Sequence, residues 1–336
     1  MLLLPAARGC TTTRQTTLVK EPPSGDDWLH ELKFDGYRML CRVDHGKVSF
    51  WSRNGKDWTS KFLAVAEAVK SLPLTSAFID GEIVVVDAQG RSSFQKLQRA
   101  MGKSVTDGFV FQVFDLIYLD GFDLTQTPLK ERKAALKKLC GSSRGFIRYS
   151  EHMEGKGDEF YKHACEYAIE GIVSKLAASP YSSTRNRNWL KVKCNKQQEF
   201  VIVGYTPSSK GLPGFGSLVL GVYEENKLVY AGRVGTGFTL KLRSELQKQL
   251  DKLSRSTSPL SVVPKDPGLR TTRWTEPKLI AEVAFIEWTS DGSIRHPSFQ
   301  GLREDKVPKE VVREMPNDPK PIAKQRSKAS TTKVKN

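Results

Sequence analysis

The chain has 336 residues, of which 38% are hydrophobic and 27% are charged, and its formal net charge is +16 at pH 7. This size allows two domains that each bury a core, and this composition is typical of a globular protein. No apolar run approaches the roughly 18 residues of a membrane-spanning helix, so no membrane segment is expected. The large positive charge favours a polyanionic partner, and nucleic acid is the expected one. The alternative is a basic protein without such a partner.

Cysteine spacing indicates the compartment. The five cysteines lie far apart and form no CxxC pair, which predicts reduced thiols in a cytoplasmic protein rather than a disulfide framework. The histidines do not cluster with them, so no structural zinc site is expected. The three leucines at 2–4 are followed at once by proline and are too short for an export signal. The cysteines are Cys10, Cys41, Cys140, Cys165 and Cys194.

The first half of the chain is expected to be mainly β-structure. Residues 1–25 are threonine-rich and then carry a Pro-Pro-Ser-Gly run, so we expect a flexible N-terminus. Apolar alternation and turn residues then predict strands and amphipathic helices over 26–197. The Asp-His-Gly-Lys sequence at 44–47 is typical of a hairpin turn. The expected strands are 38–43, 48–52, 78–87 and 110–119, and the expected helices are 61–72, 129–139 and 159–168.

A second region begins near residue 198. Successive strands with Gly/Pro-rich connections are interrupted by one helix, which predicts a small closed β-barrel such as an OB-fold over 198–315. Residues 316–336 are rich in Lys, Ser and Thr without apolar periodicity, which predicts a disordered basic tail. The expected strands here are 199–205, 217–223, 227–234 and 280–289, and the expected helix is 238–253.

The most informative stretch runs from Glu31 to Arg38 and carries a lysine, a carboxylate and an arginine around a glycine. Lysine is a covalent nucleophile only when its amine is neutral, so the pKa of Lys33 should be depressed by neighbouring cations, a metal or burial. Gly36 allows close approach of the backbone to a ligand. The alternative for this window alone is a surface turn with scattered charges.

Charged residues inside apolar strands are the second anomaly. Asp80 and Glu82 are two residues apart, so they share one face of a strand that should be largely covered. Such carboxylates need cations or a metal, unless they reach water at a sheet end. Lys191 and Lys193 show the same pattern with opposite charge, and either these carboxylates or a phosphate would serve as their partner. Glu170 is another carboxylate beside a β-branched pair.

Taken in order, these segments resemble the motifs of the covalent nucleotidyltransferases, the superfamily of ATP-dependent DNA ligases, RNA ligases and mRNA capping enzymes. The motifs are Lys-Phe-Asp-Gly-Tyr-Arg at 33–38, Ser-Arg-Asn-Gly at 52–55, Asp-Gly-Glu at 80–82, Phe-Gln-Val-Phe-Asp at 111–115, Glu-Gly-Ile-Val-Ser-Lys at 170–175, Trp-Leu-Lys-Val-Lys at 189–193 and Arg-Glu-Asp-Lys at 303–306.

Further segments look like the ligase module of bacterial DNA ligase D, a family that serves non-homologous end joining with the Ku protein. They are Ser-Pro-Tyr at 179–181 before Arg185, Gly-Thr-Gly-Phe at 235–238, Glu-Trp-Thr at 287–289, Ile-Arg-His-Pro at 294–297 and Gly-Leu at 301–302 ahead of the last motif. The resemblance covers about residues 20–313 and omits the polymerase and phosphoesterase modules. The chain is therefore a stand-alone ligase or an excised module, and partnership with Ku stays open.

The resemblance implies an α+β fold: an adenylation (nucleotidyltransferase) domain of antiparallel sheets with flanking helices at 26–197, followed by an OB-fold β-barrel. It also implies a three-step reaction in which Lys33 takes AMP from ATP, the AMP passes to a 5′-phosphate at a nick, and a 3′-hydroxyl displaces it. The substrate would be nicked or broken duplex DNA, the metal Mg²⁺ or Mn²⁺, and the enzyme a monomer.

Site residues follow from the same resemblance. Lys191 and Lys193 would neutralise the α-phosphate and help to keep the Lys33 amine neutral, and Phe114 would stack on adenine with Ile172 or Val173 opposite. For Phe114 the alternative is core packing. Glu82 and Glu170 are the candidates for the metal or for the ribose hydroxyls, and Lys175 and Arg185 would contact nucleotide phosphates. The full nucleotide-binding set is Glu31, Arg38, Arg53, Glu82, Phe114, Ile172, Lys175, Arg185, Lys191, Lys193, Arg303 and Lys306.

Arg303, Asp305 and Lys306 lie in the second domain, far along the chain from Lys33. They reach a triphosphate only if that domain swings over the cleft, so domain closure is predicted for the first step and reopening for the later ones. Two rival functions remain. One is an RNA ligase or capping-type nucleotidyltransferase, and the other is a basic DNA-binding scaffold with an inactive transferase domain.

Overall fold

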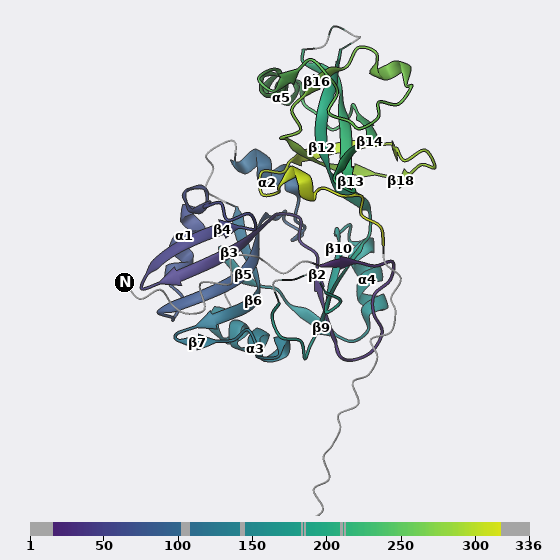
Figure 1. Cartoon of the computed structure of the whole chain (residues 1–336). Coiled ribbons are helices and arrows are strands. Elements are labelled where there is room, and N and C mark those ends of the chain that lie inside the picture. The colour runs from purple at the N-terminus through teal and green to yellow at the C-terminus, as the bar shows by residue number, and fades with distance from the viewer. Residues whose placement is uncertain are drawn as a thin grey trace, which may run out of the picture.

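The computed structural model describes residues 16–101, 108–141, 145–182, 184, 186–208, 211 and 213–316. Two adjoining sheets with surrounding helices form the first part of the chain, and a separate β-rich domain follows them (Figure 1). The tail expected at 316–336 lies outside the described residues except for Pro316.

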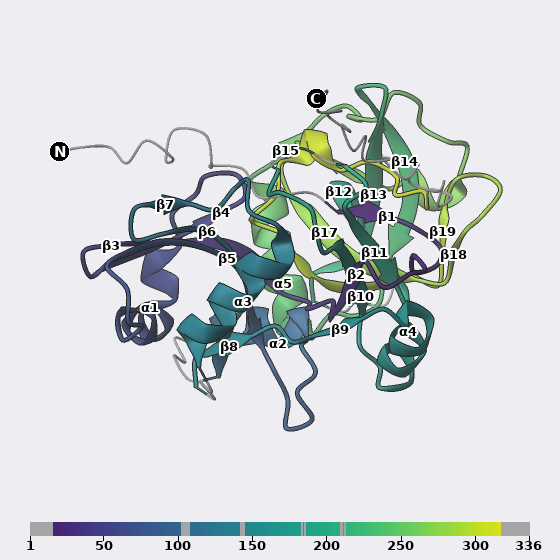
Figure 2. The same cartoon turned by 90° about the horizontal axis from the view of Figure 1, so that it is seen from below.

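The first sheet grows from the predicted hairpin. β3 pairs antiparallel with β4 and β5, and β5 continues to β6 and β7, while β8 adds parallel to β6. Apolar side chains of α1, α2 and α3 share one buried core with this sheet, and Figure 2 shows α1 and α3 on one side of it. The elements are β3 (Tyr37–Asp44), β4 (Lys47–Ser52), β5 (Ser76–Val85), β6 (Phe109–Leu119), β7 (Phe122–Asp123), β8 (Ile147–Tyr149), α1 (Leu63–Lys70), α2 (Phe94–Met101), α3 (Leu129–Cys140) and the 3-10 turn η2 (Thr59–Lys61).

The second sheet has the order β1-β11-β10-β2-β9 and is covered by α4. Thr17 and Leu18 form β1 against β11, so this part of the N-terminus that was expected to be flexible is built into the sheet. The elements are β1 (Thr17–Leu18), β2 (Trp28–Leu32), β9 (His152–Glu154), α4 (Gly157–Glu166), β10 (Gly171–Leu176) and β11 (Trp189–Lys193).

The expectation of reduced thiols throughout is wrong for one pair. Cys165 at the end of α4 and Cys194 just after β11 form a disulfide with their Cα atoms 5.3 Å apart. The two cysteines are 29 residues apart in the chain, and only the packing of α4 on this sheet brings them together. Cys41 and Cys140 are free and buried, and Cys10 lies outside the described residues.

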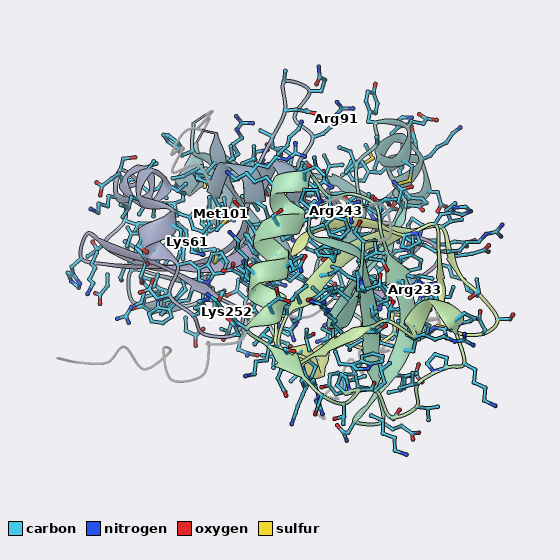
Figure 3. All side chains as sticks on the ribbon, turned by 90° about the horizontal axis from the view of Figure 1, so that it is seen from above. Lys61, Arg91, Met101, Arg233, Arg243 and Lys252 are labelled. Carbon is cyan, nitrogen blue, oxygen red and sulfur yellow. A yellow bond between two sulfur atoms is a disulfide. The ribbon has the colours of Figure 1, made fainter. Side chains whose placement is uncertain are left out.

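The second domain is built on the long strand β12, which pairs with β13, β16 and β17. The second domain has a hydrophobic core of its own, to which α5 contributes. Arg243 of α5 donates hydrogen bonds to the main-chain oxygens of Phe215, Gly216 and Gly235 (Figure 3). The elements are β12 (Lys196–Pro207), β13 (Phe215–Glu224), β14 (Lys227–Val234), α5 (Leu240–Asp251), β15 (Ser254–Arg255), η3 (Pro267–Leu269), β16 (Arg273–Thr275), β17 (Ile280–Phe285), β18 (Glu287–Trp288), β19 (Ile294–Arg295), β20 (Ser298–Leu302) and η4 (Pro308–Glu310).

The predicted fold class is confirmed, since antiparallel sheets with flanking helices are followed by a β-domain consistent with an OB-fold. Helix α2 was not predicted, and the strand expected at 280–289 is divided into β17 and β18. No helix among the described residues is long and apolar enough to cross a membrane.

Candidate active site

One cavity between the two domains collects nearly all of the predicted site residues. The exceptions are Ile172, which lies elsewhere, and Arg185, which lies outside the described residues. The predicted residues that line the cavity are Glu31, Lys33, Arg38, Arg53, Glu82, Phe114, Glu170, Lys175, Lys191, Lys193, Arg303 and Lys306.

Lys33 lies just beyond β2, where its main-chain N–H donates to the Gly171 carbonyl at 2.9 Å. Its Nζ forms an ion pair with Glu170 Oε2 at 2.5 Å. The predicted depression of its pKa is wrong for this structure. Burial lowers the pKa of Lys33 and so does Lys193, but the Glu170 and Glu82 carboxylates together outweigh both, and the net direction is upward. Deprotonation of this amine therefore requires the charge of Glu170 to be neutralised or moved.

The Asp-Gly turn packs tightly on β5. A Cβ added at Gly36 would meet the Ile83 carbonyl oxygen at 2.3 Å, so only glycine allows this approach. The Gly36 N–H donates to Glu82 Oε1 at 3.2 Å. Burial raises the pKa of Glu82 to about 7, although the Lys33 charge opposes it. Glu82 therefore presents a carboxylate to the cavity that a cation would stabilise.

Asp80 shares the strand face of Glu82, as predicted, but has a structural role. Arg38 is on β3, the antiparallel neighbour of β5, and donates two hydrogen bonds of 3.0 and 2.6 Å to Asp80. Tyr181 donates a third hydrogen bond to the same carboxylate at 3.1 Å. The Asp80 carboxylate is fully buried, and this ion pair sets the direction of the partly exposed Arg38 guanidinium at the cavity wall.

Two aromatic rings form an apolar wall of the cavity. Phe114 and Trp189 lie edge to face with centroids 6.0 Å apart, and Lys175 Nζ lies 4.3 and 4.2 Å from their centroids. Lys175 also pairs with the buried Glu31 carboxylate at 2.8 Å. Burial lowers the pKa of Lys175 to about 8, with Glu31 opposing the shift. Lys175 and Glu31 thus lie beside the aromatic wall of the cavity, and phosphate contact by Lys175 stays a prediction.

The choice between the two β-branched residues of β10 is decided by strand alternation. Ile172 is fully buried and packs with Trp28 and Val192 in the core under α4, so its prediction as a cavity residue is wrong. Val173 points to the opposite face and lines the cavity.

Lys191 and Lys193 share one carboxylate. Glu314 Oε1 lies 2.5 Å from Lys191 Nζ, and Glu314 Oε2 lies 2.8 Å from Lys193 Nζ. The sequence interpretation that Asp80 and Glu82 could pair with these lysines is wrong, because Asp80 is taken by Arg38. Burial and the neighbouring Lys193 lower the pKa of Lys191 to about 8, and despite burial the two lysines lower that of Glu314 to about 2.

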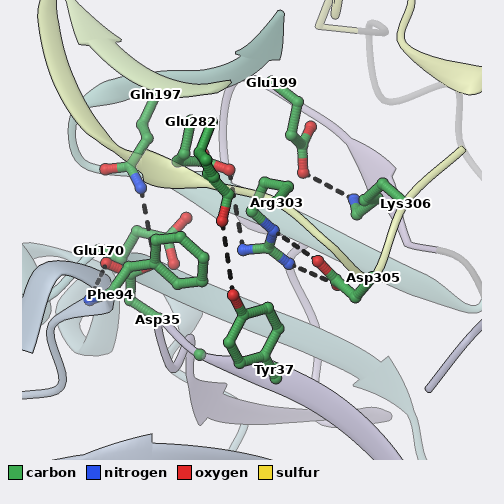
Figure 4. Close-up of polar contacts among 12 residues, drawn as sticks. Asp35, Tyr37, Phe94, Glu170, Gln197, Glu199, Glu282, Arg303, Asp305 and Lys306 are labelled. Carbon is green, nitrogen blue, oxygen red and sulfur yellow. Dashed lines mark hydrogen bonds and ion pairs between the residues drawn. The ribbon is translucent and has the colours of Figure 1, made fainter. Parts of the chain in front are cut away.

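The second domain brings its own charges to the cavity (Figure 4). Arg303 binds Asp305 through two hydrogen bonds of 2.9 and 2.8 Å and lies 3.7 Å from Glu282. Lys306 pairs with Glu199 at 2.6 Å. The predicted basic residues of the second domain thus line the same cavity as Lys33, which is the arrangement that the closure prediction requires. The reopening stays a prediction.

Three carboxylates of the cavity were missed. Glu282 could have been found, because it interrupts the apolar strand Ile-Ala-Glu-Val-Ala-Phe as Asp80 and Glu82 interrupt theirs. Burial and the neighbouring Glu199 raise the pKa of Glu282 to about 8. Glu199 and Glu314 carry no comparable signal in the sequence, since Glu199 lies in the polar first part of β12 and Glu314 follows the last motif.

Comparison with known proteins agrees with this geometry. The family described as ATP dependent DNA ligase domain matches residues 10–193, and that described as ATP dependent DNA ligase C terminal region matches residues 212–306. The chain belongs to the ATP-dependent DNA ligases. The two matches lie in both domains of the structure.

Individual relatives are similar over most of the chain. It is 39% identical over 310 residues to the multifunctional non-homologous end joining protein LigD of Pseudomonas aeruginosa and 35% identical over 289 residues to that of Mycobacterium tuberculosis. These matches cover 91% and 85% of this ligase but only 37% of each relative. A solved structure of mycobacterial DNA ligase D complexed with ATP and MES matches with a TM-score of 0.67 and 33% identity, covering 90% of this chain and 98% of that one.

Proposed function

We propose that this ligase seals 5′-phosphate/3′-hydroxyl breaks in duplex DNA through a lysyl-AMP intermediate on Lys33. The observation that carries the proposal is the position of Lys33 Nζ in a cavity that also holds Lys191, Lys193 and Arg303. Three cations that line the same cavity as one amine suit a substrate whose reacting centre is a polyphosphate.

In the first step Lys33 Nζ attacks the α-phosphorus of ATP. The P–N bond forms as the bond from that phosphorus to the bridging oxygen breaks, and pyrophosphate leaves with the electron pair. The attacking amine gives up a proton, and Glu170 Oε2 at 2.5 Å is the nearest acceptor. Lys191 and Lys193 would receive the α-phosphate in place of Glu314, and Arg303 with Lys306 would orient the leaving group. Phe114 would stack on adenine.

Divalent metal fits the remaining carboxylates. Glu82 and Glu170 both line the cavity, and Glu82 forms no ion pair among the described residues. Mg²⁺ or Mn²⁺ is held by oxygen ligands, often one or two carboxylates together with substrate phosphates, and these two side chains would supply the carboxylates. The negative charge of Glu170 raises the pKa of Lys33. A cation that neutralises this charge would therefore favour the neutral amine of Lys33.

Two later steps complete sealing. AMP passes from Lys33 to the 5′-phosphate at the break, and the 3′-hydroxyl then attacks that phosphate, forming the phosphodiester bond and releasing AMP. Duplex DNA is the proposed substrate because the net charge is +16 and the relatives are named as end-joining proteins. The rival RNA ligase or capping activity has no such support.

Cellular partners are proposed on the relatives alone. We infer a role in end joining in the bacterial cytoplasm, with Ku as a recruiting partner and the ligase acting as a monomer. The names of the LigD relatives support end joining, while this chain spans 37% of their length.

The decisive experiment incubates the protein with α-labelled ATP and magnesium and then adds a nicked duplex. Wild type should acquire one acid-labile adenylate and seal the nick, and Lys33→Ala should do neither. GTP and RNA ends serve as comparison substrates for the rival activity. Absence of adenylate on wild type, or preference for RNA ends, would overturn the proposal.

A further inference from the structure

The contact between α2 and β20 joins the two domains directly beside Arg303. β20 pairs with β17 on one edge, and its other edge faces α2 of the first domain. Gln98 Oε1 accepts a hydrogen bond from the Leu302 N–H at 3.1 Å, and Gln98 Nε2 donates to the Leu302 carbonyl. One turn earlier, Gln95 Nε2 donates to the Phe299 carbonyl at 3.1 Å. The two glutamines thus take the place of a neighbouring strand.

This contact requires close approach. A Cβ added at Gly301 would lie 2.3 Å from Gln98 Oε1 and 2.9 Å from the Phe94 ring. Tyr37 reinforces the same point, since its hydroxyl donates to the Leu302 carbonyl at 3.4 Å and accepts from Gln98 Nε2 at 3.3 Å. On the β20 side, every polar contact is to a main-chain atom. The contacts therefore depend on where the β20 backbone lies and not on the side chains of β20.

Helix α2 is in turn connected to the reactive lysine. The Phe94 N–H at its start donates to Asp35 Oδ2 at 3.1 Å, and Asp35 is two residues after Lys33. The Arg303 guanidinium lies 4.5 Å from the centroid of the Phe94 ring. A short path of direct contacts therefore runs from Lys33 through α2 to the residue before Arg303.

We propose that Gln98 is a positioning residue for adenylate formation, which holds the backbone of Leu302 so that Arg303 faces Lys33. Gln98 contacts neither Lys33 nor the residues proposed to bind the nucleotide. It acts by fixing the position of β20 against α2. The contact belongs to the closed arrangement, so it serves the ATP step and is dispensable for sealing. This inference rests on the proposed function and adds a residue outside the ligase motifs.

The test compares the two steps separately in Gln98→Ala, in Gly301→Ala and in Lys96→Ala, an exposed control on the same helix. Single-turnover adenylation with labelled ATP should slow by about 10- to 100-fold in the first two variants, the loss typical of a displacement near 1 Å. Sealing of a pre-adenylated nick should stay within about twofold of wild type, because that step follows domain reopening. The control should match wild type in both.

Equal losses in both steps would show that Gln98 only supports the fold, and an unchanged adenylation rate would show that the contact is unimportant. Either result overturns the inference. Gln98→Glu adds a second check, because it keeps the acceptor for Leu302 N–H but sets a carboxylate against the Leu302 carbonyl, so it should be as slow as Gln98→Ala. Failure of the proposed function is recognised separately, as a wild-type protein that forms no adenylate at all.

Discussion

Replacing Glu314 by glutamine should increase the affinity of the ligase for ATP. Glu314 bridges Lys191 and Lys193 at 2.5 and 2.8 Å, and these lysines are the proposed site of the α-phosphate. A phosphate and this carboxylate compete for the same two ammonium groups. The glutamine variant keeps the shape of the side chain and removes its charge.

The magnitude follows from the burial of the three groups. Their side chains are 15%, 11% and 22% exposed, so solvent screens the two ion pairs only in part. Hydrogen bonds to charged groups contribute about 1.5–3 kcal/mol each. Because glutamine retains one acceptor oxygen, we expect the cost of displacement to fall by about 1–2 kcal/mol, which corresponds to a 5- to 30-fold lower ATP concentration at half-maximal rate.

The assay measures single-turnover adenylation over a range of ATP concentrations in wild type, Glu314→Gln and Lys309→Gln. Lys309 is exposed in the same segment and serves as the matched control. Raising the salt concentration should narrow the difference between wild type and Glu314→Gln, since the competition is electrostatic. An unchanged or higher half-maximal ATP concentration in Glu314→Gln would refute the reasoning.

Three further outcomes are expected. Arg303→Ala should abolish self-adenylation and spare sealing of pre-adenylated nicks; equal loss of both activities would contradict the closure argument. Phe114→Leu should raise the half-maximal ATP concentration by about 5- to 140-fold, because stacking on a base contributes roughly 1–3 kcal/mol, and a change below twofold would argue for a packing role. Burial and Glu199 raise the pKa of Glu282 from 4.5 to about 8, so between these values the folded chain holds a proton that the unfolded chain has lost, and stability falls as pH rises. Glu282→Gln should therefore gain thermal stability over wild type at pH 9 relative to pH 5, by roughly 2–4 °C per kcal/mol, and a constant difference across this range would rule out the titration.

Much of the fold followed from local patterns. The hairpin of β3 and β4 was predicted because alternating apolar residues and an Asp-His-Gly-Lys turn depend only on neighbours in the chain. Helix α2 was missed because its apolar residues Phe94 and Leu97 give a short signal. Its polar side chains are explained only by the second domain, since Gln98 binds Leu302, 204 residues away.

The sequence by itself determined the family and which residues are proposed to react, because the motifs around Lys33 and Arg303 are contiguous and their residue types limit the chemistry. Only the tertiary structure decided which charges meet. It brought Glu314 to Lys191 and Lys193 and joined Cys165 to Cys194. The direction of the shift in the Lys33 pKa was also decided only by the tertiary structure. It is the sum of burial and through-space charges, which no local pattern encodes.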